Sequence, residues 1–322
     1  MRVMNPRTMA ESQVVLITGT SSGIGRLAAE TVARAGHTVY ASMRATASKN
    51  RETAESLAKL AAAESLALRI IDLDVTRTES VNDAVRTVLQ DTGRLDVLVN
   101  NAGHMAIGIT EAFNEAQIEE QMNVNFMGPA RLCRAVLPHM RKSRQGLIIH
   151  ISSIVGRVLF PACAFYCASK FALEAYAEVL RYELTGSGVD SVIVQPGPFP
   201  TRLLANSPEP ADRERTHSYE QIAEIRAMFM DVFGKFFASE QSTNPQEVAD
   251  AISNLIDLPA GQRPLRTVCG PDYGARAINT YIAPIQAEVL RALGMPEMAK
   301  RAMDSTGEPG ERREQTQTTD AA

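Results

Sequence analysis

The chain has 322 residues, of which 45% are hydrophobic and 22% charged, and its formal net charge is -4 at pH 7. These are ordinary globular values, and the weakly acidic balance gives no reason to expect nucleic acid or an anionic membrane surface as a partner. No apolar run approaches the roughly 18–20 residues of a membrane span, and the first dozen residues lack the apolar core of a signal peptide. We therefore expect a cytoplasmic protein.

The first predicted strand leads into a glycine-rich turn. Residues 1–12 are expected to be a disordered leader, and residues 14–18 form a short apolar run typical of a strand buried on both faces of a parallel sheet. A helical pattern follows through Ala35. The turn between them holds the candidate cofactor-binding residues Gly19, Ser21, Ser22, Gly23, Ile24 and Gly25. Glycines here permit close approach to a pyrophosphate, which the helix N-terminus would bind. The alternative is a turn that binds no ligand.

Strands and helices then alternate. The pattern predicts further strands at residues 37–42, 68–75, 95–99, 147–151, 192–195 and 267–269, with helices at 48–66, 78–91, 114–141, 164–184 and 246–257. Pro138 marks a kink or a stop in the long helix. Such alternation indicates right-handed crossovers and a parallel sheet. We therefore predict one α/β domain over residues 13–275, a doubly wound, Rossmann-type parallel seven-stranded sheet with helices on both faces. Ligands should bind at the carboxyl ends of the strands.

Residues 198–244 interrupt this alternation. Four prolines and a charged patch precede a run rich in Met and Phe at 225–237, which would form a small lid over an apolar substrate. The alternative is a helix that simply packs against the domain. Beyond the domain we expect a helical extension over residues 276–304 and a disordered tail over residues 305–322, which lacks large apolar side chains.

The fifth predicted strand ends near Ser153, and the following helix carries Tyr166 and Lys170. Four residues make about one helical turn, so Tyr166 and Lys170 project from the same face. An ammonium beside a phenol favours the phenolate and lowers the pKa of the tyrosine. With the Ser153 hydroxyl, these groups can pass a proton to or from a carbonyl oxygen. The alternative is a helix in which the two residues lie one turn apart by chance.

With these motifs assembled, the chain resembles the short-chain dehydrogenase/reductase family over residues 12–275. The matching elements are Thr18-Gly19-x-x-x-Gly23-x-Gly25, Asn100-Asn101-Ala102-Gly103, Asn125, Ser153, Tyr166-x-x-x-Lys170 and Pro196-Gly197. The stretch from Tyr166 to Glu174 is most similar to the branch that acts on steroid and retinoid alcohols and related ketones. Cys133, Cys163, Cys167 and Cys269 suit neither a disulfide scaffold nor a zinc site, so we expect reduced thiols and no metal.

The resemblance implies hydride transfer between a nicotinamide and a hydrophobic carbonyl or secondary alcohol. It implies Tyr166 as general acid or base, Lys170 as the group that lowers its pKa and holds the nicotinamide ribose, and Ser153 as the group that polarises the substrate oxygen. Asn125 would carry a water-linked proton relay, with Asn123 as the nearby alternative.

The resemblance also implies further cofactor contacts. They are Asp74, Val75, Asn101, Ala102, Gly103, Pro196, Gly197, Phe199 and Thr201, together with Tyr166 and Lys170. Asp74 and Asn101 would line the adenine and ribose side, although Asp74 has the alternative role of a strand-end cap. Thr201 would reach the nicotinamide carboxamide, but the two prolines beside it depart from the family pattern. His104 is expected to be an exposed loop residue.

The end of the second strand indicates which cofactor is bound. An NAD enzyme has a carboxylate there, which accepts from the ribose 2′-hydroxyl and repels a 2′-phosphate. This chain has Ser42 and Arg44 instead; Arg44 can pair with a phosphate and Ser42 can hydrogen-bond it. The basic residue that the family often carries before the second glycine is missing, since Ser22 stands there. We therefore expect NADP, with NAD as the alternative.

Two rival functions remain open. One is a catalytically silent, NADP-sensing regulatory protein of the same fold, which would have no use for the Ser153–Tyr166 pair. The other is a nucleotide-sugar epimerase or dehydratase, against which the single-domain length and the apolar lid count. In the family the helices at 114–141 and 164–184 usually pack against a partner subunit, so the resemblance implies a homodimer or homotetramer.

Overall fold

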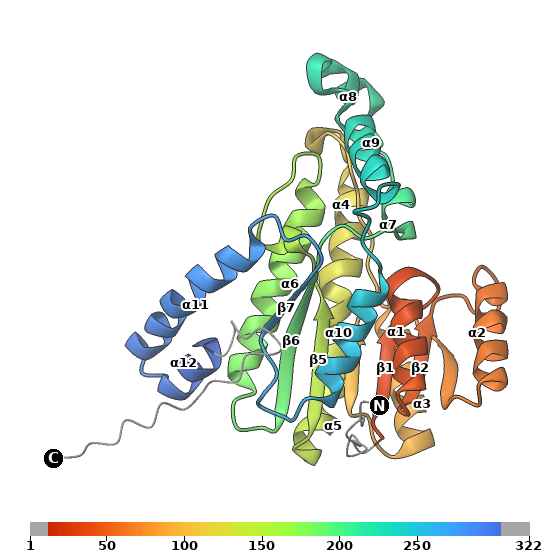
Figure 1. Cartoon of the computed structure of the whole chain (residues 1–322), viewed down its shortest axis with the longest axis vertical. Helices are drawn as coiled ribbons and strands as arrows, with labels where there is room; N and C mark the ends of the chain where they lie inside the picture. The colour runs from red at the N-terminus through yellow and green to blue at the C-terminus, as the bar shows by residue number, and fades with distance from the viewer. Residues whose placement is uncertain (1–11, 304–322) are drawn as a thin grey trace, which may run out of the picture.

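A computed structural model describes residues 12–303 of the protein. Within this range a seven-stranded parallel sheet forms the centre of the domain (Figure 1). The strands are β1 (Val14–Thr18), β2 (Thr38–Met43), β3 (Leu68–Asp72), β4 (Val97–Asn100), β5 (Gly146–Ile151), β6 (Val189–Pro196) and β7 (Arg266–Cys269). Their order is β3-β2-β1-β4-β5-β6-β7. The chain therefore changes direction across the sheet between β1 and β4, where doubly wound folds bind ligands. The predicted fold class is confirmed.

Helices cover both faces of the sheet. They are α1 (Gly23–Arg34), α2 (Arg51–Ala63), α3 (Thr78–Thr92), α5 (Gly128–Ser143), α6 (Ala164–Glu183) and α10 (Gln246–Asp257). In β1, Val15 and Ile17 join the apolar cluster that includes α1, α2 and α10, whereas Val14 and Leu16 join the cluster that includes α3, α5 and α6. Successive side chains of a strand point to opposite faces, so an all-apolar strand requires helices on both sides.

The predicted helix 114–141 contains a turn of π-helix. α4 (Glu115–Met122) continues through the π-helix Asn123–Met127 into α5. The chain remains helical through Pro138, so the proline does not stop it. A proline removes one helical hydrogen bond, and the packing of α5 against the sheet outweighs that loss. A π-turn inserts one extra residue into the helical period and re-aims the side chains it contains.

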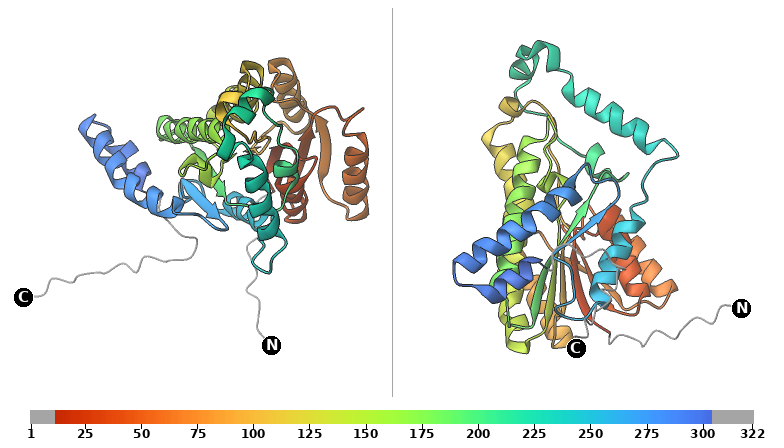
Figure 2. Two further views of the ribbon diagram at one scale, coloured as in Figure 1. Left: turned by 90° about the horizontal axis from the view of Figure 1, so that it is seen from above. Right: turned by 60° about the vertical axis from the view of Figure 1, so that its left-hand side comes forward.

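Two helical segments extend the domain (Figures 1 and 2). The segment between β6 and α10 rises beyond the carboxyl ends of the strands, and the segment after β7 stands off at the β7 edge. The first holds α7 (Arg202–Ala205), α8 (Arg213–Ser218), the 3-10 helix Glu220–Ile222 and α9 (Ile225–Phe237), and the second holds α11 (Ala275–Ala292) and α12 (Pro296–Met303). The expected disordered tail, and the expected leader up to residue 11, lie outside the described residues.

Candidate active site

The side chains of Ser153, Tyr166 and Lys170 meet at the carboxyl end of β5. Ser153 lies two residues after the strand, and its Oγ donates to the carbonyl of Pro196 at 3.3 Å. Tyr166 and Lys170 are buried on α6, where the ammonium Nζ lies 5.8 Å from the centre of the phenol ring. Nζ also donates to the carbonyl of Ile151 at 2.8 Å. The structure therefore brings together the three side chains that the sequence singled out.

Burial dominates the protonation of these groups. It raises the pKa of Tyr166, and a hydrogen bond with Ser153 acts in the opposite direction. It lowers the pKa of Lys170 from 10.5 to about 8, although the charge of Glu174 raises it. The net pKa of Tyr166 is therefore raised, whereas the sequence analysis expected it to be lowered. Burial destabilises the phenolate more than the neighbouring groups stabilise it. A neutral phenol is the form that donates a proton.

Asn125 joins the loop after β4 to the helix that carries Tyr166. Its Oδ1 accepts from the N–H of His104 at 3.0 Å, and its Nδ2 donates to the His104 carbonyl at 2.9 Å and to Ser169 Oγ at 3.0 Å. A Cβ on Gly103 would lie 3.2 Å from Asn125 Oδ1 and 3.8 Å from Lys170 Nζ. Asn125 and Lys170 thus flank one glycine. His104 is half-buried rather than exposed, because the loop is held down by these bonds.

The glycine-rich turn is closed tightly against the segment after β4. A Cβ on Gly19 would lie 2.8 Å from the Cα of Ala102, and a Cβ on Gly25 would lie 2.3 Å from Asn101 Nδ2. That amide donates to the carbonyls of Thr18 and Gly19 at 2.8 and 3.2 Å. The side chain of Asn101 therefore shapes the turn, and its expected place beside the adenine and ribose stays a prediction. Side chains in place of these glycines would force the two segments apart.

The start of α1 suits the phosphates of a dinucleotide. Ser22 precedes the helix, and among the described residues its side chain makes no capping hydrogen bond. The first turn of α1 contains no acidic residue. Ser21, Gly23 and Ile24 are half-buried beside it. A helix N-terminus with uncapped N–H groups attracts an anion, so these residues fit the pyrophosphate of a nicotinamide dinucleotide.

Arg44 is exposed just beyond β2, whereas Ser42 is fully buried within the strand. A buried hydroxyl cannot meet a ribose phosphate at the surface, so the expected contribution of Ser42 is wrong and that of Arg44 stays a prediction. Asp74 accepts from the N–H and the hydroxyl of Thr76 at 2.9 and 2.7 Å, which makes it a strand-end cap. This cap ends β3 earlier than predicted. Val75 is buried next to it.

The segment after β6 returns to the glycine-rich turn. A Cβ on Gly23 would lie 3.3 Å from the Cβ of Thr201, whose hydroxyl caps α7 by accepting from the N–H of Leu203 at 3.3 Å. Gly197 fits against Pro271, since a Cβ there would lie 2.2 Å from its carbonyl oxygen. The Phe199 side chain packs into the core instead of lining the cleft. Any contact of Phe199 with a cofactor would therefore come from its main chain.

An apolar cluster surrounds Tyr166 and reaches into the predicted lid. Its buried members are Met105, Ile107, Ile154, Val155, Cys163, Tyr166, Cys167 and Ala275, and Leu203, Leu204, Phe229 and Met230 of the lid pack against them. The helix α9 is otherwise largely exposed. A helix that packs a few apolar side chains against the cluster around Tyr166, with little burial of its own, can move more readily than one inside the core.

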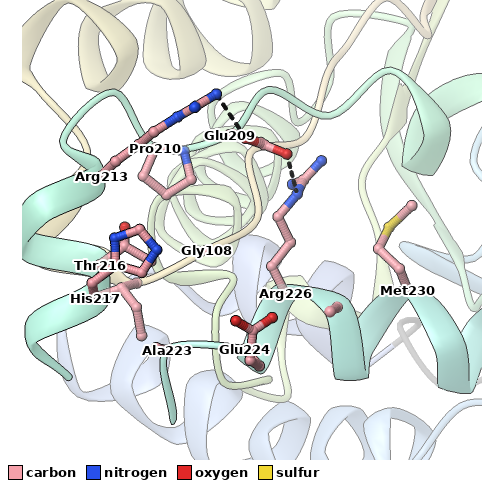
Figure 3. A pocket seen from close by; sticks show the side chains of 12 residues that line it. Gly108, Glu209, Pro210, Arg213, Thr216, His217, Ala223, Glu224, Arg226 and Met230 are labelled. Atoms are coloured by element: carbon pink, nitrogen blue, oxygen red, sulfur yellow. Dashed lines mark ion pairs between the residues drawn. The ribbon is translucent and has the colours of Figure 1, made fainter. Parts of the chain in front are cut away.

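Arg226 ties α9 to the loops beneath it (Figure 3). Its guanidinium donates to the carbonyl of Ile107 at 2.9 Å and to that of Ser207 at 2.8 Å. Glu209 lies 3.8 Å from both Arg226 and Arg213 and pairs with each (Figure 3). These groups, together with apolar side chains that include Ile109 and Met230, line a cavity of about 460 Å³. Arg226 thus links α9 to the domain through the Ile107 carbonyl, while Gln117 and Glu111 hold the segment before α9.

Several residues that shape the site were missed by the sequence analysis. Thr18 Oγ1 accepts from the N–H groups of Asn101 and Ala102, each at 3.0 Å, and Ser169 holds Asn125. Both stood inside the quoted motifs and could have been noticed there. Gln121 also supports the His104 loop, with its Nε2 donating to the His104 carbonyl at 2.8 Å. Nothing in its surroundings in the sequence indicated that role.

The described residues also bear on the expectations for metals, cysteines and membrane spans. Between residues 12 and 303, no group of three or more His, Cys, Asp or Glu side chains could hold a metal ion. The four cysteines, all within that range, are buried and free of disulfides. No helix in this part of the chain is long and apolar enough to cross a bilayer.

A parallel doubly wound sheet, a glycine-rich turn before a helix and a Ser–Tyr–Lys set at the carboxyl edge fit an oxidoreductase of the nicotinamide-dependent class. The family model described as short chain dehydrogenase matches residues 13–212. The chain belongs to the short-chain dehydrogenase/reductase family, and the resemblance drawn from its motifs is confirmed.

Named relatives lie close in sequence. The chain is 36% identical over 261 residues to a 3-ketodihydrosphingosine reductase of Bacteroides thetaiotaomicron, covering 81% of this chain and 89% of the relative. It is 36% identical over 257 residues to human retinol dehydrogenase 8, covering 77% and 78%. The crystal structure of a short-chain dehydrogenase from Streptomyces avermitilis superposes with a TM-score of 0.70 at 32% identity, covering 88% and 98%. Other solved neighbours were determined with NADP or with NAD.

Proposed function

We propose that the protein is an NADP-preferring oxidoreductase that transfers a hydride between nicotinamide and a carbonyl or secondary alcohol on a hydrophobic molecule. The observation that carries this proposal is the burial of Tyr166 in an apolar cluster, with the Lys170 ammonium 5.8 Å from its ring and the buried Ser153 at the end of the neighbouring strand. Apolar walls around a proton-donating phenol favour a substrate whose polarity is confined to the reacting oxygen. The relatives named for 3-ketodihydrosphingosine and for retinol support that substrate class.

The side chains have distinct roles in this reaction. Tyr166 donates its proton to the carbonyl oxygen in reduction and accepts one in oxidation. Ser153 orients the same oxygen, and the ammonium of Lys170 stabilises the phenolate that forms. Asn125 holds the His104 carbonyl, and its Oδ1 and the Lys170 ammonium flank Gly103, so Asn125 can support a water-linked path for replacing the proton. When bound, the nicotinamide supplies or accepts the hydride.

The preference for NADP depends on Arg44. It is exposed just beyond β2, with no carboxylate among residues 42–44, and the pKa of nearby Asp74 is lowered by Thr76 and Arg44 against the raising effect of burial. A guanidinium near the ribose edge favours a 2′-phosphate. The first test is a titration with NADPH and NADH followed by nicotinamide fluorescence. We expect tighter NADPH binding, which Arg44→Ala weakens about tenfold without affecting NADH.

Arg77→Ala is the matched control for that titration, because Arg77 is a second exposed arginine near Asp74. It should leave both affinities unchanged. Tighter NADH binding would overturn the NADP assignment and favour oxidation of an alcohol. Binding of neither nucleotide would remove the proposed activity altogether.

Turnover separates the proposed enzyme from its rivals. Long-chain, steroid-like and retinoid-like ketones should be reduced with NADPH, and Tyr166→Phe should lower kcat by about 10²–10⁴-fold while nucleotide binding persists. A nucleotide-sensing regulator would show no turnover in the unaltered protein and would keep its partner interaction in Tyr166→Phe. Turnover with nucleotide sugars, and none with apolar ketones, would instead favour an epimerase or dehydratase.

We also propose that the enzyme is a cytoplasmic homodimer or homotetramer that associates through α4–α5 and α6. Met127, Phe171 and Val179 are apolar side chains exposed on this part of the molecule. Burying them against another copy would remove apolar surface from water. Light scattering should give two or four times the chain mass of 35.0 kDa. A monomeric mass at micromolar concentration would contradict the assembly.

A further inference from the structure

Four buried charges form a cluster next to the proposed active site. Glu174 and Glu178 lie on α6, Arg157 follows the Ser153 loop, and Arg266 lies on β7. Arg266 Nε contacts Glu174 Oε2 at 2.8 Å, and its Nη2 contacts Glu178. Arg157 lies 3.5 Å from Glu174 and 3.4 Å from Glu178. Two carboxylates thus balance two guanidinium groups, and none of the four side chains is more than 16% exposed.

Glu174 connects this cluster to the segments that carry Ser153, Lys170 and Pro196. It lies one helical turn after Lys170 on α6, which places both side chains on one face. Its Oε1 accepts from Gln195 at 2.8 Å, and Gln195 adjoins the Pro196 carbonyl that Ser153 contacts. A Cβ on Gly156 would lie 2.8 Å from Glu174 Cγ, so the Ser153 loop packs directly on this side chain.

The charge of Lys170 depends on few groups. The cation lies beside the Tyr166 ring, and its charge lowers the pKa values of His104 and His150. Glu174 is the acidic group that acts on it, raising the pKa of Lys170 against the effect of burial. Burial raises the pKa of Glu174 itself to about 7, so above neutral pH the carboxylate is ionised. Without that carboxylate the cluster would hold two positive charges and one negative charge one turn from Lys170.

We propose that Glu174 is a positioning residue that keeps Lys170 charged and shields it from Arg157 and Arg266. This inference rests on the proposed function for its catalytic consequence, because a protonated Lys170 is the form that stabilises a Tyr166 phenolate. The charge state of Lys170 can nevertheless be measured without turnover. The carboxylate acts through Lys170 and does not contact the reacting atoms.

The chain has six lysines, so ¹³Cε-labelled lysine should give six resolvable NMR signals. The signal that is missing from the spectrum of Lys170→Met is assigned to Lys170. We expect Glu174→Gln to lower the titration midpoint of Lys170 by on the order of one pH unit. Glu178→Gln removes the same charge from the same two arginines one turn farther away, and should cause a smaller shift. Thermal unfolding and NADPH binding verify that each variant is folded.

A compensated variant separates charge from packing. Glu174→Gln combined with Arg266→Gln restores the balance of the cluster and should return the Lys170 midpoint toward the wild-type value. Arg266→Gln alone should raise the midpoint, and this single variant keeps the test decisive if Glu174→Gln fails to fold. An unchanged midpoint in Glu174→Gln, or a double variant shifted as far as Glu174→Gln, would overturn the proposal.

The activity measurement is distinguishable from these outcomes. The pH at which kcat/KM for ketone reduction falls on the alkaline side of its pH profile should differ between wild type and variants by the same amount as the titration midpoint of Lys170. A residue that only holds the fold would lower kcat/KM equally at every pH. If no variant and no wild-type protein turns over any ketone, the proposed function fails, and the NMR titration still decides whether Glu174 sets the charge of Lys170.

Discussion

Thr18 and Asn101 lock together the ends of two neighbouring strands. The Asn101 amide donates to the Thr18 carbonyl at 2.8 Å, and the Thr18 hydroxyl accepts from the Asn101 N–H at 3.0 Å. Thr18 ends β1 and Asn101 follows β4, so the bonds span the point at which the strand order reverses. The dinucleotide-binding turn therefore owes its conformation to this pair as much as to its glycines.

Thr18→Val keeps the shape of the side chain and removes its oxygen. The N–H groups of Asn101 and Ala102 then lose their acceptor, so the free energy of unfolding should fall by about 1–3 kcal/mol, and NADPH binding should weaken as the turn loosens. Thr18→Ser keeps the hydroxyl and should lose at most about 1 kcal/mol, from one methyl group. Urea unfolding and nucleotide titration check both variants. Equal stability of the two would contradict this role for the hydroxyl.

Asn125→Ala removes three hydrogen bonds, two to His104 and one to Ser169. We expect a loss of about 1–3 kcal/mol in unfolding free energy, because buried partners are left unpaired, and a fall of at least tenfold in kcat. Asn123 lies in the same π-turn, and within the described part of the chain its Oδ1 has no hydrogen-bond partner. Asn123→Ala should therefore change stability by less than about 0.5 kcal/mol. Similar losses in the two variants would reject Asn125 as the residue of the relay.

Arg226→Ala should loosen the lid. The variant loses the hydrogen bonds to Ile107 and Ser207. If their loss lowers the local stability of the lid by about 1.4 kcal/mol, protease cleavage within residues 202–237 should become about tenfold faster. KM for bulky ketones should rise with little change in the global melting temperature. Arg213→Ala removes an exposed arginine whose pair with Glu209 spans 3.8 Å, and it should behave as wild type. Cleavage at the wild-type rate in Arg226→Ala would count against the link.

Lys170→Met should stabilise the fold while abolishing turnover. Burial lowers the pKa of Lys170 from 10.5 to about 8. Between these values the unfolded chain binds more protons than the folded chain, so stability rises with pH through this window. Below pH 8 the buried ammonium costs up to about 3 kcal/mol, partly offset by its bond to Ile151.

Urea unfolding at pH 7 and at pH 10.5 checks this expectation. Lys170→Met should be more stable than the wild type at pH 7 and should lose that advantage at pH 10.5. Lys235→Met is the control, because the Lys235 side chain is 76% exposed and its removal should produce no such dependence. A Lys170→Met variant that is less stable by the same amount at both pH values would show that packing, and not charge, dominates.

The alternation of strands and helices, the glycine-rich turn and the Ser153–Tyr166–Lys170 set could all be predicted from the sequence. Each depends on a local pattern along the chain: short continuous apolar runs for strands buried on both faces, one helical turn between Tyr166 and Lys170, and glycine where backbone must approach backbone. Such patterns depend only on residues that are close together in the chain, so they can be recognised without knowing the fold.

Tertiary structure decided the rest. The residues of the π-turn at Asn123–Met127 are ordinary for a helix, so no pattern in the sequence predicted the turn. The bond between Asn101 and Thr18 was not predicted, because β1 and β4 are neighbours only through the crossover of the sheet. Glu174 meets Arg266 across 92 positions of the chain. The order of the strands decides which residues so far apart in the chain come into contact. The sequence alone could therefore identify the candidate site residues, but it could not identify the residues that contact them from other segments.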